Sequence, residues 1–130
     1  MIFMKFEIAE ECSHLSDNEQ ITFPEVVKRL MDAGIDSYYV DLIGHTKTFY
    51  AENQSYSVKG NHHAAPIGET FNGQGVVDAI RQIQQGAIKY QTFLKKIMEA
   101  GTTSYHVFIK GRKAMYLGKK GEMHIEEFPK

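Results

Sequence analysis

The sequence contains the same pattern twice, at a spacing of 67 residues. When the chain is shifted by this spacing, residues 21–58 align with residues 88–125 without a gap, and nine of the 38 aligned pairs are identical. Average amino-acid usage would give roughly two or three identities by chance. The identical pairs include Gly34/Gly101 at a predicted turn, and the other matches are mostly apolar residues in phase. This internal duplication predicts two similar units that share one core.

Each copy opens with a segment that has the helical period. Thr22 and Glu25 have the spacing of a capping box, and Lys89 stands where the second copy would need its cap. Gly34 and Gly101 end the two predicted helices, because glycine adopts the left-handed conformation without steric cost. The apolar stripe consists of Phe23, Val26, Val27, Leu30 and Met31 in the first copy and of Tyr90, Phe93, Leu94, Ile97 and Met98 in the second.

After each of these glycines, the apolar residues alternate with a period of two, which predicts strands. The dipeptides Gly44-His45 and Gly111-Arg112 predict tight hairpin turns. Each copy therefore continues as a three-stranded meander. The predicted strands lie near residues 38–42, 47–51 and 55–59 in the first copy and near 105–109, 113–117 and 122–126 in the second.

One further amphipathic helix precedes each copy, at residues 4–15 and 76–85. The sequence thus predicts an α+β fold, a tandem duplication of a helix-helix-three-strand unit with the helices packed on antiparallel sheet. We expect residues 1–130 to form a single domain, since half a chain of this length would be marginally stable alone. Its two repeats span about residues 1–59 and 72–126 and are joined by a loop at 60–71. Whether the repeats face each other or extend one sheet stays open.

The composition is that of a globular protein. No apolar run approaches the roughly 20 residues that cross a membrane, and residues 1–11 carry four charged side chains in place of an apolar signal core. A single cysteine, Cys12, excludes an internal disulfide and favours a cytoplasmic location. We expect no membrane partner and no export.

The charge is divided unevenly between the halves. Residues 1–67 hold five Lys and Arg against ten Asp and Glu, and residues 68–130 hold ten against six. The basic half could bind nucleic acid, but its basic residues are dispersed rather than clustered as a phosphate-binding surface requires. Nucleic-acid binding is therefore the third and weakest functional hypothesis.

Three groups of residues carry a resemblance to a known family. They are Thr22–Val27 with Ala33-Gly34 and Ser37–Asp41; Ala79–Gln84 with Gly86, Ile88 and Tyr90; and Ala100-Gly101, Tyr105, Val107, Gly111-Arg112, Tyr116, Gly121-Glu122, His124, Glu126 and Phe128-Pro129. In these residues the chain resembles the uncharacterised bacterial family typified by YbcV and YdfO. Its members are often labelled phage envelope proteins, which implies a phage or prophage relation and no established activity. At Thr102, where a cysteine is common in the family, this chain departs from the pattern.

The last predicted strand offers one candidate catalytic group. Glu122, His124 and Glu126 alternate, so we expect them on one face of the strand. A histidine between carboxylates could act as a general acid–base or bind a metal. The alternative is a solvated strand face, with Met123 and Ile125 directed inward.

The outer faces of the first strands offer a candidate site for a ligand or partner. Tyr39 and Asp41 in the first copy and His106 and Phe108 in the second should lie opposite the core, with Arg112 nearby. Such a face could bind a small molecule or a protein. It could also pack sheet against sheet between the repeats, or form a homodimer interface.

Other signatures are weak or missing. The adjacent His62 and His63 lie in the loop and lack the spacing of a metal motif, so we expect them to be solvated. We find no GxGxxG after a strand, no P-loop and no GxSxG, and we predict no cofactor and no metal. The sequence favours a non-enzymatic binding module for an unknown small molecule or protein. The alternative is a small enzyme that uses His124 with Glu122 or Glu126.

Overall fold

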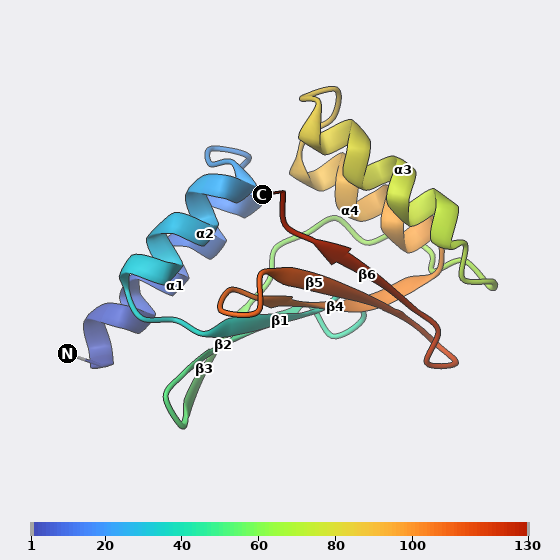
Figure 1. Cartoon of the computed structure of the whole chain (residues 1–130). Coiled ribbons are helices and arrows are strands. Elements are labelled where there is room, and N and C mark those ends of the chain that lie inside the picture. The colour runs from blue at the N-terminus through green and yellow to red at the C-terminus, as the bar shows by residue number, and fades with distance from the viewer. Residues whose placement is uncertain (1, 130) are drawn as a thin grey trace.

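The structure is a computed structural model that describes the backbone of residues 2–129 and the side chains of residues 5–129. In this part of the chain, two helices and then three strands occur twice in succession (Figure 1). The elements match the predicted ranges to within three residues. They are α1 (Ile2–Asp17), α2 (Phe23–Asp32), β1 (Ser37–Asp41), β2 (Thr46–Ala51), β3 (Gln54–Lys59), α3 (Gly73–Gln84), α4 (Tyr90–Glu99), β4 (Thr102–Phe108), β5 (Lys113–Gly118) and β6 (Met123–Glu127).

The predicted helix ends are present. The N–H of Glu25 donates to Thr22 Oγ1 (3.4 Å), and the N–H of Thr22 donates to Glu25 Oε1 (3.3 Å), which completes the capping box of α2. At α4, Lys89 makes no side-chain capping bond, as its sequence predicts. Gly34 and Gly101 follow the two helices with φ of 84° and 95°. A left-handed conformation of this kind suits glycine, which has no Cβ.

The two halves form one sheet, joined at its centre. The strand order is β3-β2-β1-β4-β5-β6, and all neighbouring strands are antiparallel. Strands β1 and β4 pair so that Tyr39 lies opposite His106, the residue 67 positions later. The interpretation that the sheets of the two repeats pack face to face is therefore wrong, because the two halves form a single sheet edge to edge.

The helices cover one face of this sheet in two pairs, α1 with α2 and α3 with α4 (Figure 1). The core lies between the helices and the sheet, which confirms the predicted α+β fold. Among the described residues, the largest fully buried side chains of this core are Leu30, Ile35, Leu94, Ile97, Met98, Val40, Val76, Val107, Thr102 and Cys12. The opposite face, which we call the open face, carries no covering layer within residues 2–129.

The turn before β6 differs from its counterpart by one residue. In the first half Tyr50 pairs with Ser55, whereas in the second half Leu117 pairs with Met123, so the second turn is one residue longer. Successive side chains of a strand point to opposite faces, so this one residue reverses the faces of β6. The expectation that Met123 and Ile125 point inward is therefore wrong. Both lie on the open face and are 54% and 45% exposed.

A buried ion pair ties α1 to the sheet. Lys47 of β2 and Asp17 of α1 are almost fully buried, and their charged atoms Nζ and Oδ1 lie 2.8 Å apart. The second carboxylate oxygen of Asp17 accepts the N–H of Asn61 at 3.0 Å, so the same pair also holds the start of the connecting loop. Lys47 is in phase with the buried Phe49 and Ala51 of β2, which is the signal in the sequence that places it on the helix side.

The prediction that both histidines of the loop at 60–71 are solvated is wrong for His62. His62 is buried, and its Nε2–H donates to the carbonyl oxygen of Leu42 at 3.0 Å. Its ring stacks on the ring of His45 at a centroid distance of 4.0 Å. Burial lowers the pKa of His62 and outweighs the hydrogen bond with Leu42, which raises it. His62 therefore serves the packing of the loop.

Candidate functional site

The open face carries a cluster of aromatic rings at its centre. The ring of His106 lies 5.7 Å from Tyr39, 5.8 Å from Tyr50 and 4.2 Å from Phe108, measured between centroids. Three different strands supply these residues, β1, β2 and β4. We call Tyr39, Tyr50, His106 and Phe108 the aromatic cluster. The sequence predicted three of its members and missed Tyr50, although Tyr50 alternates with the buried Phe49 and Ala51 and so must face outward.

His106 is a neutral ring at the centre of this cluster. Its Nε2 lies 3.2 Å from Ser37 Oγ, and burial lowers the pKa of its imidazole. A lowered pKa keeps the ring uncharged at neutral pH. The cluster therefore offers partly exposed, uncharged aromatic surface with one polar edge.

A shallow hollow adjoins the cluster on the open face. Tyr50 and His106 form one side of it, and the β2–β3 hairpin forms the other. His106 comes from the second half of the chain, whereas the other lining residues come from the first, so the hollow lies at the junction of the halves. Its full lining is Asp36, Ser37, Tyr50, Ala51, Glu52, Asn53, Gln54, Ser55 and His106.

The remainder of the open face is divided into an apolar and a polar half. Beyond Phe108, strands β5 and β6 present Met115 opposite Ile125 and Leu117 opposite Met123, with the charged pair Lys113 and Glu127 at one end, and all are at least partly exposed. On the other side of the cluster, β2 and β3 present hydroxyl groups, and Thr48 bonds to Ser57 at 2.8 Å. The apolar half is continuous with the aromatic cluster, because His106 pairs with Met115.

Two predicted site residues lie outside the cluster. The carboxylate of Asp41 accepts the N–H groups of Ile43 (3.0 Å) and Gly44 (2.8 Å), so it stabilises the turn after β1. Arg112 donates to the carbonyl oxygen of Pro129 at 3.3 Å, and its guanidinium lies 5.7 Å from the ring of Phe128. Both side chains are therefore engaged locally.

The predicted catalytic group is only partly assembled. Glu122 precedes β6, and its carboxylate accepts the N–H of Lys120 at 2.8 Å within the turn. Glu122 therefore lies in the turn before β6, where its Oε1 would be 2.8 Å from a Cβ on the buried Gly118. His124 and Glu126 do share a face, which is the face toward the helices, and His124 Nε2 lies 3.1 Å from Glu126 Oε1.

Glu126 is held on its other side by α3. Arg81 Nη1 lies 2.7 Å from Glu126 Oε2. Burial raises the pKa of Glu126, but hydrogen bonds from Arg81 and His124 outweigh it and bring the pKa below the ordinary value. A carboxylate stabilised in its ionised form is a poor proton donor at neutral pH. In the structure, the ion pair between Arg81 and Glu126 holds β6 against α3.

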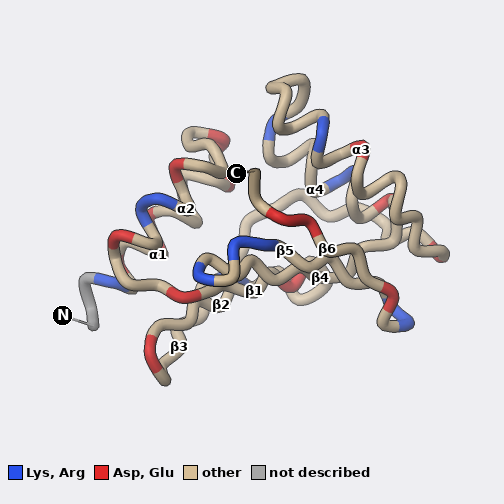
Figure 2. The backbone as a smooth tube through the Cα atoms, in the orientation of Figure 1, with Lys and Arg blue, Asp and Glu red and all other residues tan. Residues whose placement is uncertain are grey.

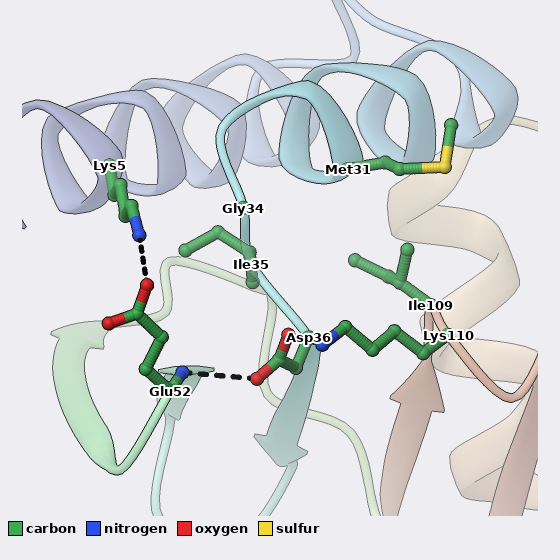
Figure 3. Close-up of a pocket in the computed structure, with 8 residues that line it drawn as sticks. All are labelled: Lys5, Met31, Gly34, Ile35, Asp36, Glu52, Ile109 and Lys110. Carbon is green, nitrogen blue, oxygen red and sulfur yellow. Dashed lines mark hydrogen bonds and ion pairs between the residues drawn. The ribbon is translucent and has the colours of Figure 1, made fainter.

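A second hollow lies at the same end of the sheet, on the helix side (Figure 3). It shares Asp36 and Glu52 with the hollow on the open face. Two ion pairs flank it, Lys5 with Glu52 (3.0 Å) and Lys110 with Asp36 (2.9 Å). The hydrogen bond from Lys110 lowers the pKa of Asp36. The remaining lining residues are Met31, Gly34, Ile35 and Ile109, and we call this hollow the Gly34 pocket.

The Gly34 pocket was not predicted from the sequence. Its residues are separated widely in the sequence, and they meet because Ile109 N–H donates to the carbonyl oxygen of Asp36 at 3.0 Å, at the end of the β1–β4 pairing. In the sequence Met31 is identical to Met98 of the second copy, and no sequence signal shows that Met31 is exposed whereas Met98 is buried.

Lys and Arg are spread over helices, turns and strands in Figure 2. No group of three or more His, Cys, Asp or Glu side chains in the described part of the chain is arranged to hold a metal ion. None of the described helices combines the length and apolar character that crossing a membrane requires.

Comparison with known proteins gives one match. A family model described as "Protein of unknown function (DUF1398)" matches residues 14–127, which is most of the chain. No curated protein sequence matches.

Proposed function

Since the chain belongs to this DUF1398 family, whose function is unknown, we propose from its geometry that it is a non-enzymatic interaction module that binds a protein through its open face. The observation that carries the proposal is the aromatic cluster. Three aromatic rings surround the neutral His106 on a face that no described helix covers. Aromatic side chains on a flat, partly exposed surface are typical of protein interfaces.

The shape of the face favours a protein over a small molecule. Small-molecule sites are concave and enclose most of their ligand, whereas the hollow beside His106 is shallow and is lined mainly by residues with polar side chains. Six strands of about five residues cover roughly 500 Å² in plan. Because side-chain relief adds accessible area, the face approaches the roughly 800 Å² that each partner of a standard interface buries.

The partner we propose is a second copy of the chain. A two-fold axis that lies between two such faces, perpendicular to the strands, sets the apolar β5–β6 half of one copy on the same half of the other. Met115, Leu117, Met123 and Ile125 would then be buried against their own counterparts. The polar half would meet the polar half, where hydroxyl groups can bond to one another.

We also infer that the two halves arose by duplication and that the protein is related to phage or prophage proteins. The duplication is supported by nine identities in 38 aligned residues and by the repeated order of elements. Pairing of β1 with β4 adds support, because Tyr38 lies opposite Val107 and Val40 lies opposite Tyr105. The phage relation rests on the sequence resemblance alone.

Sedimentation analysis of the intact chain over a range of concentrations tests the proposed interface. We expect a dimer in the wild type and a monomer in Ile125→Glu, because a carboxylate in an apolar interface loses its hydration. The matched control is Ile43→Glu. Ile43 is 61% exposed and lies in the β1–β2 turn, outside the strand ladder, so this variant should remain dimeric. A wild type that stays monomeric, or equal loss in both variants, refutes the proposal.

A further inference from the structure

The chain turns from a helix toward a strand at two similar places, which we call the corners at Gly34 and Gly101, but the surroundings of the two corners differ. Gly34 follows α2 and Gly101 follows α4, both with positive φ, and each is preceded three residues earlier by a methionine. Met98 beside Gly101 is 1% exposed, whereas Met31 beside Gly34 is 53% exposed. The same local sequence is therefore covered in one half and uncovered in the other.

The cover at Gly101 is a segment of the connecting loop, residues 67–72, which we call the strap. Gly68 N–H donates to the carbonyl oxygen of Met98 at 2.9 Å, and Asn72 N–H donates to that of Ala100 at 2.7 Å. The strap approaches so closely that a Cβ on Gly101 would lie 2.7 Å from the carbonyl oxygen of Thr70. Its apolar side chains, Ile67 and Phe71, pack against the core.

The first helix of each half, α1 or α3, explains why only the corner at Gly101 is covered. Asn72 caps α3, since its side chain accepts the N–H of Gly75 at 3.0 Å, and the chain before it runs across Gly101. Lys5 occupies the position 67 residues before Asn72, but it lies within α1, which begins at Ile2. Residues 2–5 of α1 thus take the positions of the last strap residues, 69–72, and the ammonium of Lys5 is 3.3 Å from the place that a Cβ on Gly34 would take.

We propose that the Gly34 pocket binds an extended peptide segment of a partner protein in the way that the strap binds at Gly101. An apolar side chain of that segment lies against Met31, Ile35 and Ile109 (Figure 3). The carbonyl oxygens of Met31 and Ala33 correspond to those of Met98 and Ala100, which receive the strap's N–H groups. Gly34, like Gly101, has no Cβ, so the peptide backbone approaches it closely once the flexible end of Lys5 moves aside.

The charges around the pocket set its specificity. Lys5 and Glu52 lie on one side of the apolar floor, and Lys110 and Asp36 lie on the other (Figure 3). Lys110 is largely exposed, so its ammonium group can leave Asp36 and pair with an acidic residue of the peptide without unfolding the corner. The pocket thus selects an apolar segment that carries a carboxylate, and the strap has this composition, with Glu69 between Ile67 and Phe71.

The test uses the strap itself as the probe. A synthetic peptide of residues 65–72 (Ala-Pro-Ile-Gly-Glu-Thr-Phe-Asn) is titrated into the full ¹⁵N-labelled chain, and amide shifts are followed by NMR. We expect saturable shifts at Gly34, Ile35 and Lys110, and about tenfold weaker binding when the phenylalanine of the peptide is replaced by alanine. Shifts confined to Gly101 and its neighbours would show exchange with the strap and would overturn the proposal.

Matched variants separate this pocket from the open face. Met31→Glu should weaken the peptide at least about tenfold, whereas Met123→Glu should not. Met123 is 54% exposed, nearly the same as Met31, but it lies on the open face. Because both side chains are exposed, both variants should fold, which the dispersion of their spectra verifies. Equal affinity of Met31→Glu and the wild type would refute the site without bearing on dimerisation.

Discussion

Tyr39 lies directly opposite His106 in the central strand pair, and the two residues are 67 positions apart in the sequence. Each is therefore the counterpart of the other in the repeated pattern, and the approximate two-fold axis of the sheet passes between them. Their rings lie 5.7 Å apart at an interplanar angle of 66°. Because the two counterparts differ chemically, the centre of the open face combines a phenol and an imidazole, which neither half could supply alone.

The buried ion pair should be the most sensitive polar contact. We expect Asp17→Asn to destabilise the fold by about 3–5 kcal/mol, because it leaves the Lys47 ammonium buried without a counter-charge. The double variant Asp17→Leu with Lys47→Met should recover most of the loss. Urea denaturation followed by circular dichroism gives the free energies of unfolding. A loss below about 1 kcal/mol for Asp17→Asn would place the pair in the class of weak surface ion pairs.

Stability should fall on mild acidification because of His62. Burial places the pKa of His62 in the folded state below its ordinary value of 6.5, so the unfolded chain takes up the proton first. Stability is complete above pH 7 and decreases as the pH falls through 6.5, until the lowered pKa is reached. His62→Gln should flatten this dependence, since an amide can still donate to Leu42. Burial also lowers the pKa of His106, so a smaller dependence of stability on pH should remain in this variant. Unfolding is measured for the wild type and for His62→Gln between pH 7.5 and pH 5. Equal slopes of the free energy of unfolding against pH in the two proteins would contradict the prediction.

The two glycine corners should respond differently to alanine. Gly34→Ala meets only the flexible end of Lys5, so we expect a cost of about 1 kcal/mol from the positive φ. Gly101→Ala carries the same backbone cost and also drives the new Cβ into the Thr70 carbonyl, at 2.7 Å. The strap must then move, and we expect about 3 kcal/mol or more. Thermal unfolding of both variants measures the difference, and equal losses would mean that the strap is not held against Gly101.

The capping box should matter at α2 but not at the equivalent end of α4. Thr22→Ala removes the acceptor for the Glu25 N–H and should cost about 1 kcal/mol. Lys89→Ala at the corresponding position removes no capping bond and should change stability by less than about 0.5 kcal/mol. Chemical denaturation of the two variants in parallel tests this. A loss for Lys89→Ala as large as for Thr22→Ala would show that side-chain capping does not explain either value.

The sequence was sufficient for the features that depend on neighbours in the chain. The capping box at Thr22, the glycine stops at Gly34 and Gly101, and the alternation in β1 and β4 are local, and each was predicted within three residues of its place. A duplicated pattern also predicted the order of elements in both halves. These features follow from backbone conformation and hydrophobic period, which short stretches of sequence specify.

The sites depend on contacts between residues far apart, and only the tertiary structure decided them. Pairing of β1 with β4 brought His106 beside Tyr50 and brought Lys110 to Asp36. One additional residue in the turn before β6 moved Ile125 to the open face, because strand faces alternate with every residue. The sequence therefore determined the elements, and their long-range register, which a gapless alignment of the repeats does not specify, determined the surfaces that can bind.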